Sequence, residues 1–424
     1  METQTDKIVD KFSKINVEEN SCLNVIFVGH VDAGKSTLCG RMLVDLGLIE
    51  DRVLEKYKKD AADCNRSSWY LSWCMDLNPE EREKGKTQEM SLCSFNLKNG
   101  LKINIVDSPG HKNYVNEMID GAARADVGVL IVSARTGEFE AGFLKGGQTK
   151  EHLKLLKASG VENLIVLINK MDECSWSQER YSEIKSKVDK FVKALYKKEI
   201  EYVAVSGYTG ENVVISKNDE NQTFINVLEK MNTNINNSNN KLAVVSVLER
   251  VKASSTSFFV KIEQGSIIKG NEYFLISQNA FVTVTEIKDD DDIDLESTER
   301  VKDVYKIKIK GDMFVGDKLV DGSMKDDYKA VSEIVAQIGI YGDKLITIGY
   351  SAVLHINGIK TGMKINRIYN TEKKSIKVAR KGEKVLVQMS LEDKIVVNRK
   401  EKKRFCIRDE EMTVAMGEIV KINC

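Results

Sequence analysis

The segment GHVDAGKS, Gly29–Ser36, carries the pattern G-x-x-x-x-G-K-[ST]. Glycines let successive backbone N–H groups curl around phosphates, Lys35 supplies a positive charge, and the Ser36 hydroxyl can ligate Mg²⁺. The bare pattern occurs by chance in roughly 1 to 2% of chains of this length, but here it lies between an apolar run and an amphipathic stretch. We therefore predict a phosphate-binding loop made of Gly29, His30, Val31, Asp32, Ala33, Gly34, Lys35, Ser36 and Thr37.

A second polar segment, DSPGH at Asp107–His111, follows the apolar run KINIV. A carboxylate at a strand end, such as Asp107, can hold Mg²⁺ through water, and the N–H of Gly110 can meet a terminal phosphate. A single histidine is more often a satisfied structural residue. One placed directly after a phosphate-sensing glycine could orient an attacking water, so we assign the catalytic role to His111.

A third segment, NKMD at Asn169–Asp172, ends the run NLIVLI. The Asp172 carboxylate can accept two hydrogen bonds from guanine, a donor pair that adenine lacks, and should therefore select GTP over ATP. After the run EYVAV, Ser206 and Gly207 are expected to offer backbone N–H groups to guanine O6. The predicted base-binding residues are Asn169, Lys170, Asp172, Ser206, Gly207 and Tyr208. Each segment alone is weak evidence, but their order indicates a GTPase.

Thr87 lies in EREKGKTQEM, between the phosphate-loop helix and the DSPGH segment. A mobile segment here could bring the threonine hydroxyl to Mg²⁺ and its N–H to the terminal phosphate, and hydrolysis would release it. The predicted metal ligands are Ser36, Thr87 and, through water, Asp107.

The elements that must position these residues alternate between apolar runs and amphipathic stretches. The runs are 24–29, 101–107, 127–134, 162–170 and 201–207. Continuous Val/Ile/Leu runs separated by helices predict a mostly parallel sheet with helices on both faces, in an α/β P-loop GTPase domain.

Beyond the polar tract Asn232–Asn240 the pattern changes to short alternating runs punctuated by Gly, Asn and Asp. Such runs predict two small antiparallel β-barrels, because closure removes exposed strand edges. The expected division is a short extension (1–22), a GTP-binding domain (23–235) and two barrels (241–325 and 326–424).

Composition is typical of a soluble globular protein and gives no global attraction to nucleic acid. The chain has 424 residues, 42% of them apolar, and a formal net charge of zero. We find no secretory signal or membrane span and expect a cytoplasmic protein with reduced cysteines. Between Lys360 and Arg408, 16 Lys or Arg residues stand against 5 Asp or Glu. This stretch is either a solvated face or a docking surface for phosphate backbone or an acidic partner.

The segments GHVDAGKST, DSPGHKNYVNEMI, NKMD and GEFEAGF, with the two-barrel half, resemble the elongation factor 1-alpha branch of translational GTPases over nearly the whole chain. Within that branch, EREKGKT, GGQTKEH and RFCIRDEEMTVAMG resemble the eukaryotic release factor 3 family. The resemblance implies GTP or GDP with Mg²⁺, a water-orienting His111, and ribosome-activated hydrolysis that drives translation termination.

The same resemblance implies a tRNA-shaped class-1 release factor as partner, with a monomer or a heterodimer as the expected state. It places Arg404, Phe405 and Arg408 in or beside the surface that contacts this partner. Relatives often carry a long N-terminal extension, whereas about 23 residues precede the first predicted strand here. Three alternatives stay open: a ribosome-rescue GTPase of the Hbs type, an aminoacyl-tRNA carrier, and an adaptor that binds without hydrolysis.

Overall fold

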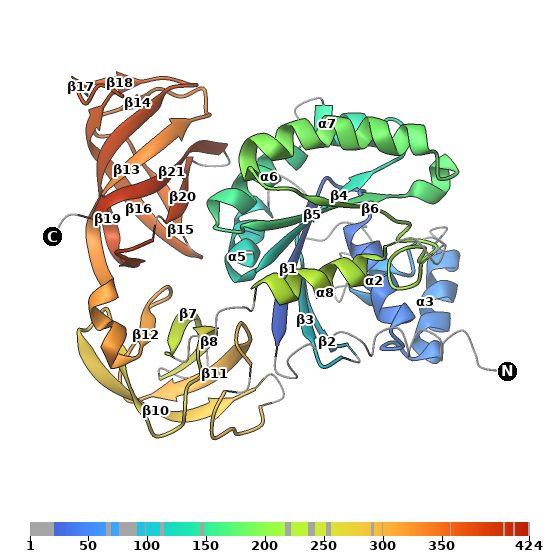
Figure 1. Cartoon of the computed structure of the whole chain (residues 1–424), viewed down its shortest axis with the longest axis horizontal. Helices are drawn as coiled ribbons and strands as arrows, with labels where there is room; N and C mark the ends of the chain where they lie inside the picture. Colours follow the sequence, from blue (N-terminus) through green and yellow to red (C-terminus); the bar gives the residue numbers. More distant parts are fainter. Residues whose placement is uncertain are drawn as a thin grey trace. The chain divides into compact units, whose positions relative to one another are not determined.

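The computed structural model describes residues 21–64, 69–75, 91–97, 99–110, 114–144, 148–216, 222–235, 242–251, 256–289, 292–298, 300–356, 358–401, 403–409 and 412–422. The chain divides into two compact units, the first drawn mainly from residues up to Asn237 and the second running from Ser238 to Cys424. Figure 1 shows the elements of both. The four-part division expected from the sequence stays a prediction.

A six-stranded sheet in the order β2-β3-β1-β4-β5-β6 forms the centre of the first unit. Its strands are β1 (Cys22–Gly29), β2 (Ser91–Asn96), β3 (Lys102–Asp107), β4 (Val127–Ser133), β5 (Asn163–Asn169) and β6 (Glu201–Ala204). Only the β2–β3 pair is antiparallel. Every residue of β1 and β4 is buried. Their continuous apolar sequences therefore reflect a sheet that is covered on both faces.

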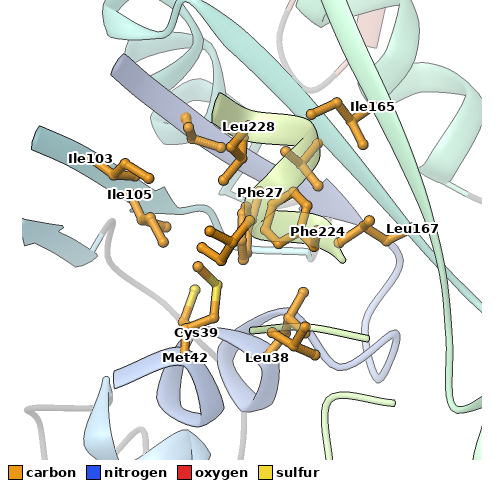
Figure 2. Close-up of a cluster of buried hydrophobic side chains, with 14 of the residues drawn as sticks. Phe27, Leu38, Cys39, Met42, Ile103, Ile105, Ile165, Leu167, Phe224 and Leu228 are labelled. Atoms are coloured by element: carbon orange, nitrogen blue, oxygen red, sulfur yellow. The ribbon is translucent and has the colours of Figure 1, made fainter. Parts of the chain in front are cut away.

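Helices lie on both faces of this sheet (Figure 1). On one face, α2 (Lys35–Asp45) and α8 (Phe224–Ile235) enclose an apolar core in which the rings of Phe27 and Phe224 lie 5.9 Å apart (Figure 2). On the other face lie α5 (Val115–Arg124), α6 (Gln148–Ala158) and α7 (Gln178–Tyr196). The remaining helical segments are α3 (Asp51–Asp63), two 3₁₀ turns (Ser72–Cys74 and Met171–Cys174) and a π-helix (Glu140–Leu144).

The second unit contains two antiparallel barrels. The first is a closed barrel of β7 (Val244–Arg250), β8 (Ser257–Gln264), β9 (Glu272–Leu275), β10 (Ala280–Lys288), β11 (Val304–Ile309) and β12 (Lys318–Val320). In β11, half-buried and buried residues alternate along the strand. This is the period of two that a strand with one face toward a core requires.

A 3₁₀ turn, Gly322–Asp327, leads into the second barrel. Its elements are β13 (Tyr328–Ile340), β14 (Ile346–Thr347), β15 (Ser351–Ile356), β16 (Ile359–Tyr369), β17 (Ser375–Ile376), β18 (Val378–Ala379), β19 (Lys384–Asn398), β20 (Arg404–Asp409) and β21 (Met412–Ile422). Pairing of β15 with both β20 and β16 closes this sheet on itself.

The predicted fold class, a P-loop type α/β domain followed by two antiparallel barrels, is confirmed. Over the part of the chain that the structure describes, we find no helix with the length and apolar character of a membrane span.

Candidate nucleotide-binding site

The predicted phosphate loop leads directly from a strand into a helix. Gly29 ends β1 and Lys35 begins α2. Gly34, the residue before the helix, has φ +88°, and a Cβ atom there would lie 2.4 Å from Asn169 Nδ2. The pattern therefore needs glycine at this position, because any other residue would be strained and would clash with a neighbouring loop.

The Lys35 ammonium lies inside this loop rather than in solvent. It donates to the carbonyl oxygens of Gly29 at 3.2 Å and His30 at 3.0 Å. Burial lowers the pKa of Lys35, and the charges of Asp107 and Asp32 partly oppose this effect. A Cβ atom at Gly110 would lie 2.5 Å from Lys35 Nζ. The structure thus brings Lys35, Asp107 and Gly110 together at the carboxyl ends of β1 and β3.

Asn169 joins three loops that are far apart in the sequence. Its Nδ2 donates to the Ala33 carbonyl at 2.9 Å, and its Oδ1 accepts from the N–H groups of Lys170 and Gly207, both at 2.8 Å. The side chain is 2% exposed. One amide therefore holds the phosphate loop, the NKMD segment and the loop after β6 in a fixed arrangement.

Asp172 lies in the 3₁₀ turn that follows Asn169 and Lys170. Its Oδ1 is buried and has no hydrogen-bond partner among the described residues. A buried carboxylate oxygen is costly unless a donor reaches it. This oxygen is therefore suited to the predicted role of accepting a hydrogen bond from an N–H group of the base. Tyr208, at the neighbouring loop, is 49% exposed.

The backbone N–H groups of Ser206 and Gly207, which are predicted to reach guanine O6, have acceptors within the chain. The Ser206 N–H donates to the Glu211 carbonyl at 3.1 Å, and the Gly207 N–H donates to Asn169 Oδ1 at 2.8 Å. These bonds satisfy two buried backbone N–H groups and shape the loop after β6. Their contact with guanine O6 stays a prediction.

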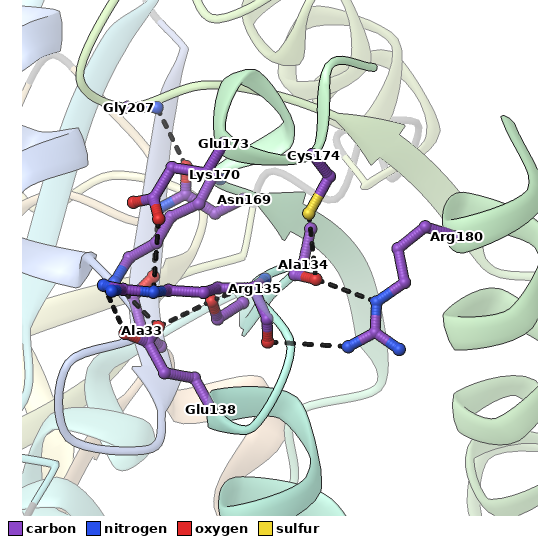
Figure 3. A network of polar contacts seen from close by, with 11 residues as sticks. Ala33, Ala134, Arg135, Glu138, Asn169, Lys170, Glu173, Cys174, Arg180 and Gly207 are labelled. Carbon is purple, nitrogen blue, oxygen red and sulfur yellow. Dashed lines mark hydrogen bonds and ion pairs between the residues drawn. The ribbon is translucent and has the colours of Figure 1, made fainter. Parts of the chain in front are cut away.

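The sequence did not predict a further group of polar residues around the three loops that Asn169 joins (Figure 3). Glu138 accepts from Lys170 Nζ at 2.8 Å and from Ser133 Oγ at 2.7 Å. Arg180, on α7, donates to the Ala134 carbonyl at 2.8 Å. The available signal was the GEFEAGF block, whose acidic residues directly follow the end of β4 at the same edge of the sheet as NKMD.

The residues expected to hold Mg²⁺ are only partly within the described chain. Ser36 lies in the first turn of α2, and the Asp107 carboxylate is completely buried near Lys35. Thr87 and His111 lie outside the described residues. No cluster of three or more His, Cys, Asp or Glu side chains suited to a metal occurs among the described residues.

The three residues predicted to lie in or beside the partner surface are on β20. Phe405 is 0% exposed and belongs to the apolar core of the second barrel, and Arg408 is 3% exposed. Arg408 donates to Thr413 Oγ1 at 3.1 Å across the β20–β21 pair. Phe405 and Ile407 belong to the core of the barrel. A partner surface here would therefore lie beside Phe405 and not include its ring. Arg404 is half-buried.

Comparisons with known proteins place these observations in a family. The family described as "Elongation factor Tu GTP binding domain" matches residues 20–260, and "Elongation factor Tu C-terminal domain" matches 327–423. The chain is 36% identical over 99% of its length to the eukaryotic peptide chain release factor GTP-binding subunit of Schizosaccharomyces pombe, and 36% identical over 94% to that of Zygosaccharomyces rouxii. It spans 66% and 64% of these relatives, slightly under two thirds.

Solved structures agree on the fold. The Saccharomyces cerevisiae Ski7 GTPase-like domain bound to GDP and inorganic phosphate is 19% identical, with a TM-score of 0.74 over 95% of this chain and 97% of that one. A bacterial selenocysteine-specific elongation factor is 18% identical, with a TM-score of 0.64 over 95% of this chain and 59% of that one.

Proposed function

Because this chain belongs to the family of elongation factor Tu GTP-binding domains, we propose that it binds GTP and hydrolyses it to drive translation termination with a class-1 release factor on the ribosome. The observation that carries the proposal is the Asn169 amide, which joins the phosphate loop to the two loops expected to bind the base. The names of the fungal relatives support the biological setting.

The proposed pocket divides recognition between two ends of the nucleotide. At the phosphate end, Lys35 offers an ammonium inside a loop of backbone N–H groups at the start of α2, where the helix dipole favours anions. At the base end, Asp172 offers a buried carboxylate oxygen to the N–H donors of guanine. The loops that Asn169 keeps together would thus bind both the phosphates and the base of the nucleotide.

We propose that Ser36, Thr87 and, through water, Asp107 hold Mg²⁺. The ion would neutralise charge on the phosphate oxygens as the bond to the terminal phosphate breaks. His111 would orient the attacking water. Slow hydrolysis by the isolated protein is expected, since we assign no arginine to the developing charge, and contact with the ribosome would supply about 10³-fold stimulation or more.

We further propose that the protein works in the cytoplasm and pairs with a tRNA-shaped partner, as a monomer or a heterodimer. We propose that the partner surface includes or adjoins Arg404, Phe405 and Arg408, within the basic stretch Lys360–Arg408.

The test is GTP turnover by the full chain with purified ribosomes, with and without a class-1 release factor. We expect strong stimulation only when both are present, and we expect His111→Ala to abolish it. Stimulation by a ribosome-rescue factor or by aminoacyl-tRNA alone would replace termination with rescue or delivery. GTP binding without any stimulated turnover would indicate a non-hydrolysing adaptor and overturn the enzymatic proposal.

A further inference from the structure

Lys170, in the NKMD segment, forms an ion pair with a residue that the predicted pocket does not include. Its Nζ lies 2.8 Å from Glu138 Oε2, and the two side chains are 21% and 28% exposed. Glu138 follows β4, whereas Lys170 follows β5. The ion pair therefore connects two neighbouring loops at the carboxyl edge of the sheet.

The side chain of Lys170 also passes beside the phosphate loop. Its Cε would lie 4.0 Å from a Cβ atom at Gly34, and its backbone adopts φ +64° at the start of the 3₁₀ turn that carries Asp172. Anchoring the ammonium thus limits where the aliphatic stem can lie between the phosphate loop and the Asp172 turn. Without an anchor, a lysine stem of this length samples several rotamers.

Glu138 is itself held in place by its surroundings. Besides the bond from Ser133 at 2.7 Å, it lies 3.3 Å from Arg135 Nη1. Burial would raise the pKa of Glu138, but bonds from Lys170 and Ser133 and the charges of Lys170 and Arg135 lower it overall. The carboxylate is therefore charged at neutral pH and can act as a fixed anchor.

A further contact fixes the loop that carries Glu138. Arg180, on α7, donates to the Ala134 carbonyl at 2.8 Å (Figure 3). The loop after β4 is thus tied to α7 on one side and to Lys170 on the other.

We propose that Glu138 is a positioning residue for guanine-nucleotide retention, which acts by fixing Lys170 between the phosphate loop and the Asp172 turn. This inference rests on the proposed GTP binding. Because Lys170 is already held in one arrangement, the phosphate loop and the Asp172 turn lose less conformational entropy when a nucleotide binds. The bound nucleotide therefore dissociates more slowly.

The first experiment measures the dissociation rate of a fluorescent GDP analogue from the full chain and from Glu138→Gln. The variant loses the anchor of Lys170, so we expect GDP to dissociate faster. A partly exposed ion pair contributes less binding free energy than a buried one, so the expected acceleration is about fivefold to tenfold. Glu140→Gln is the matched control. Glu140 begins the π-helix that follows Glu138 and pairs with Arg180, but it does not contact Lys170. Its substitution leaves in place the bond from Arg180 to the Ala134 carbonyl, which ties the loop to α7. GDP dissociation from Glu140→Gln should therefore stay within about twofold of the wild-type rate.

A double-mutant cycle separates positioning from general loop stability. In a Lys170→Met background, Glu138→Gln should cause no further acceleration, whereas a purely structural role would add the same increment in both backgrounds. Ser133→Ala keeps the Lys170–Glu138 ion pair but removes the hydrogen bond from Ser133 to Glu138. We expect a GDP dissociation rate between those of the wild type and Glu138→Gln. This variant still tests the inference if Glu138→Gln folds poorly.

Glu138→Gln and Ser133→Ala variants that fold normally and release GDP at the wild-type rate would overturn this inference alone. Failure of the wild-type chain to bind any guanine nucleotide would overturn the proposed function instead.

Discussion

At the scale of single residues, we predict that base selection in the proposed site depends on Asp172. Its buried Oδ1 has no hydrogen-bond partner among the described residues, so a guanine amine or N1–H would satisfy it. Asp172→Asn should weaken GDP binding by about tenfold or more, because a hydrogen bond to a charged group contributes about 1.5 to 3 kcal/mol. Since an amide can donate to a carbonyl, the variant should gain affinity for xanthosine diphosphate.

Competition binding with GDP and xanthosine diphosphate checks this prediction. Asp63→Asn, an exposed aspartate at the end of α3, is the control and should keep the wild-type preference. Unchanged GDP affinity in Asp172→Asn would remove the base-reading role.

A second prediction concerns His152, which is 0% exposed on α6. Burial and the nearby charges of Lys35 and His30 lower the pKa of His152 from its ordinary value of 6.5 to about 3. His152 therefore binds a proton in the unfolded chain but stays neutral in the folded chain. The free energy of unfolding falls as the pH drops below about 6.5, by up to about 1.4 kcal/mol per pH unit. We expect His152→Gln to lose most of this dependence between pH 7.5 and 5.5.

Urea unfolding followed by tryptophan fluorescence measures this effect in the first unit. All three tryptophans, Trp69, Trp73 and Trp176, lie there. His355, a buried histidine of the second unit, provides the control, because His355→Gln should leave the pH dependence of the tryptophan signal unchanged. Equal pH dependence in the wild type and His152→Gln would contradict the prediction.

At the scale of elements, the path from β1 into α2 depends on the conformation of Gly34. Gly34→Ala should reduce nucleotide binding by at least about tenfold, since a left-handed residue costs about 1 to 2 kcal/mol and the methyl group would meet Asn169. Gly160→Ala is the matched control. Gly160 has φ +92° with nothing within 4 Å of its Cβ position, so its substitution introduces strain without the clash.

Isothermal titration with GDP would compare the two glycine variants. Equal affinities would show that the contact with Asn169 has no part in shaping the loop.

Much of the element order could be predicted because the information is local. The buried strands β1 and β4 are continuous apolar runs, and Gly34 and Lys35 belong to one short pattern. The bond from Asn169 to Ala33 spans 136 residues, and the Lys170–Glu138 pair spans 32. No hydrophobic period or motif spacing encodes such long-range contacts. The sequence therefore predicted Asn169 and Lys170 as nucleotide-binding residues, but not their contacts with Ala33 and Glu138.

The burial of β20 could also be predicted from a local pattern. The resemblance implies that Phe405 lies in or beside a partner surface, and the run Phe405–Ile407 is continuous and apolar, which favours a strand covered on both faces. The pairing of β20 with β15 and β21 explains that burial.

At the scale of the whole molecule, the two units depend on different polar contacts. In the first barrel, Glu263 accepts from Ser246 at 3.1 Å and lies 3.6 Å from Lys302. Burial would raise the pKa of Glu263, but Lys261, Lys318 and Lys302 lower it overall. Its contribution to stability is therefore present above pH 4.5 and is lost as the pH falls below that value.

Glu263→Gln should destabilise the second unit, because Lys261 and Lys318, at 3% and 9% exposure, would keep their charges without this anion. Since Glu263 is itself partly exposed, we expect a loss of about 1 to 2 kcal/mol, or about 2 to 8 °C in Tm. Glu286→Gln, which breaks an exposed ion pair of the same barrel, should cause no measurable shift. Calorimetry would measure both variants, with tryptophan fluorescence identifying the first unit's transition. A shift confined to that fluorescence transition, or equal shifts in the two variants, would contradict a stabilising role for Glu263 in the barrel.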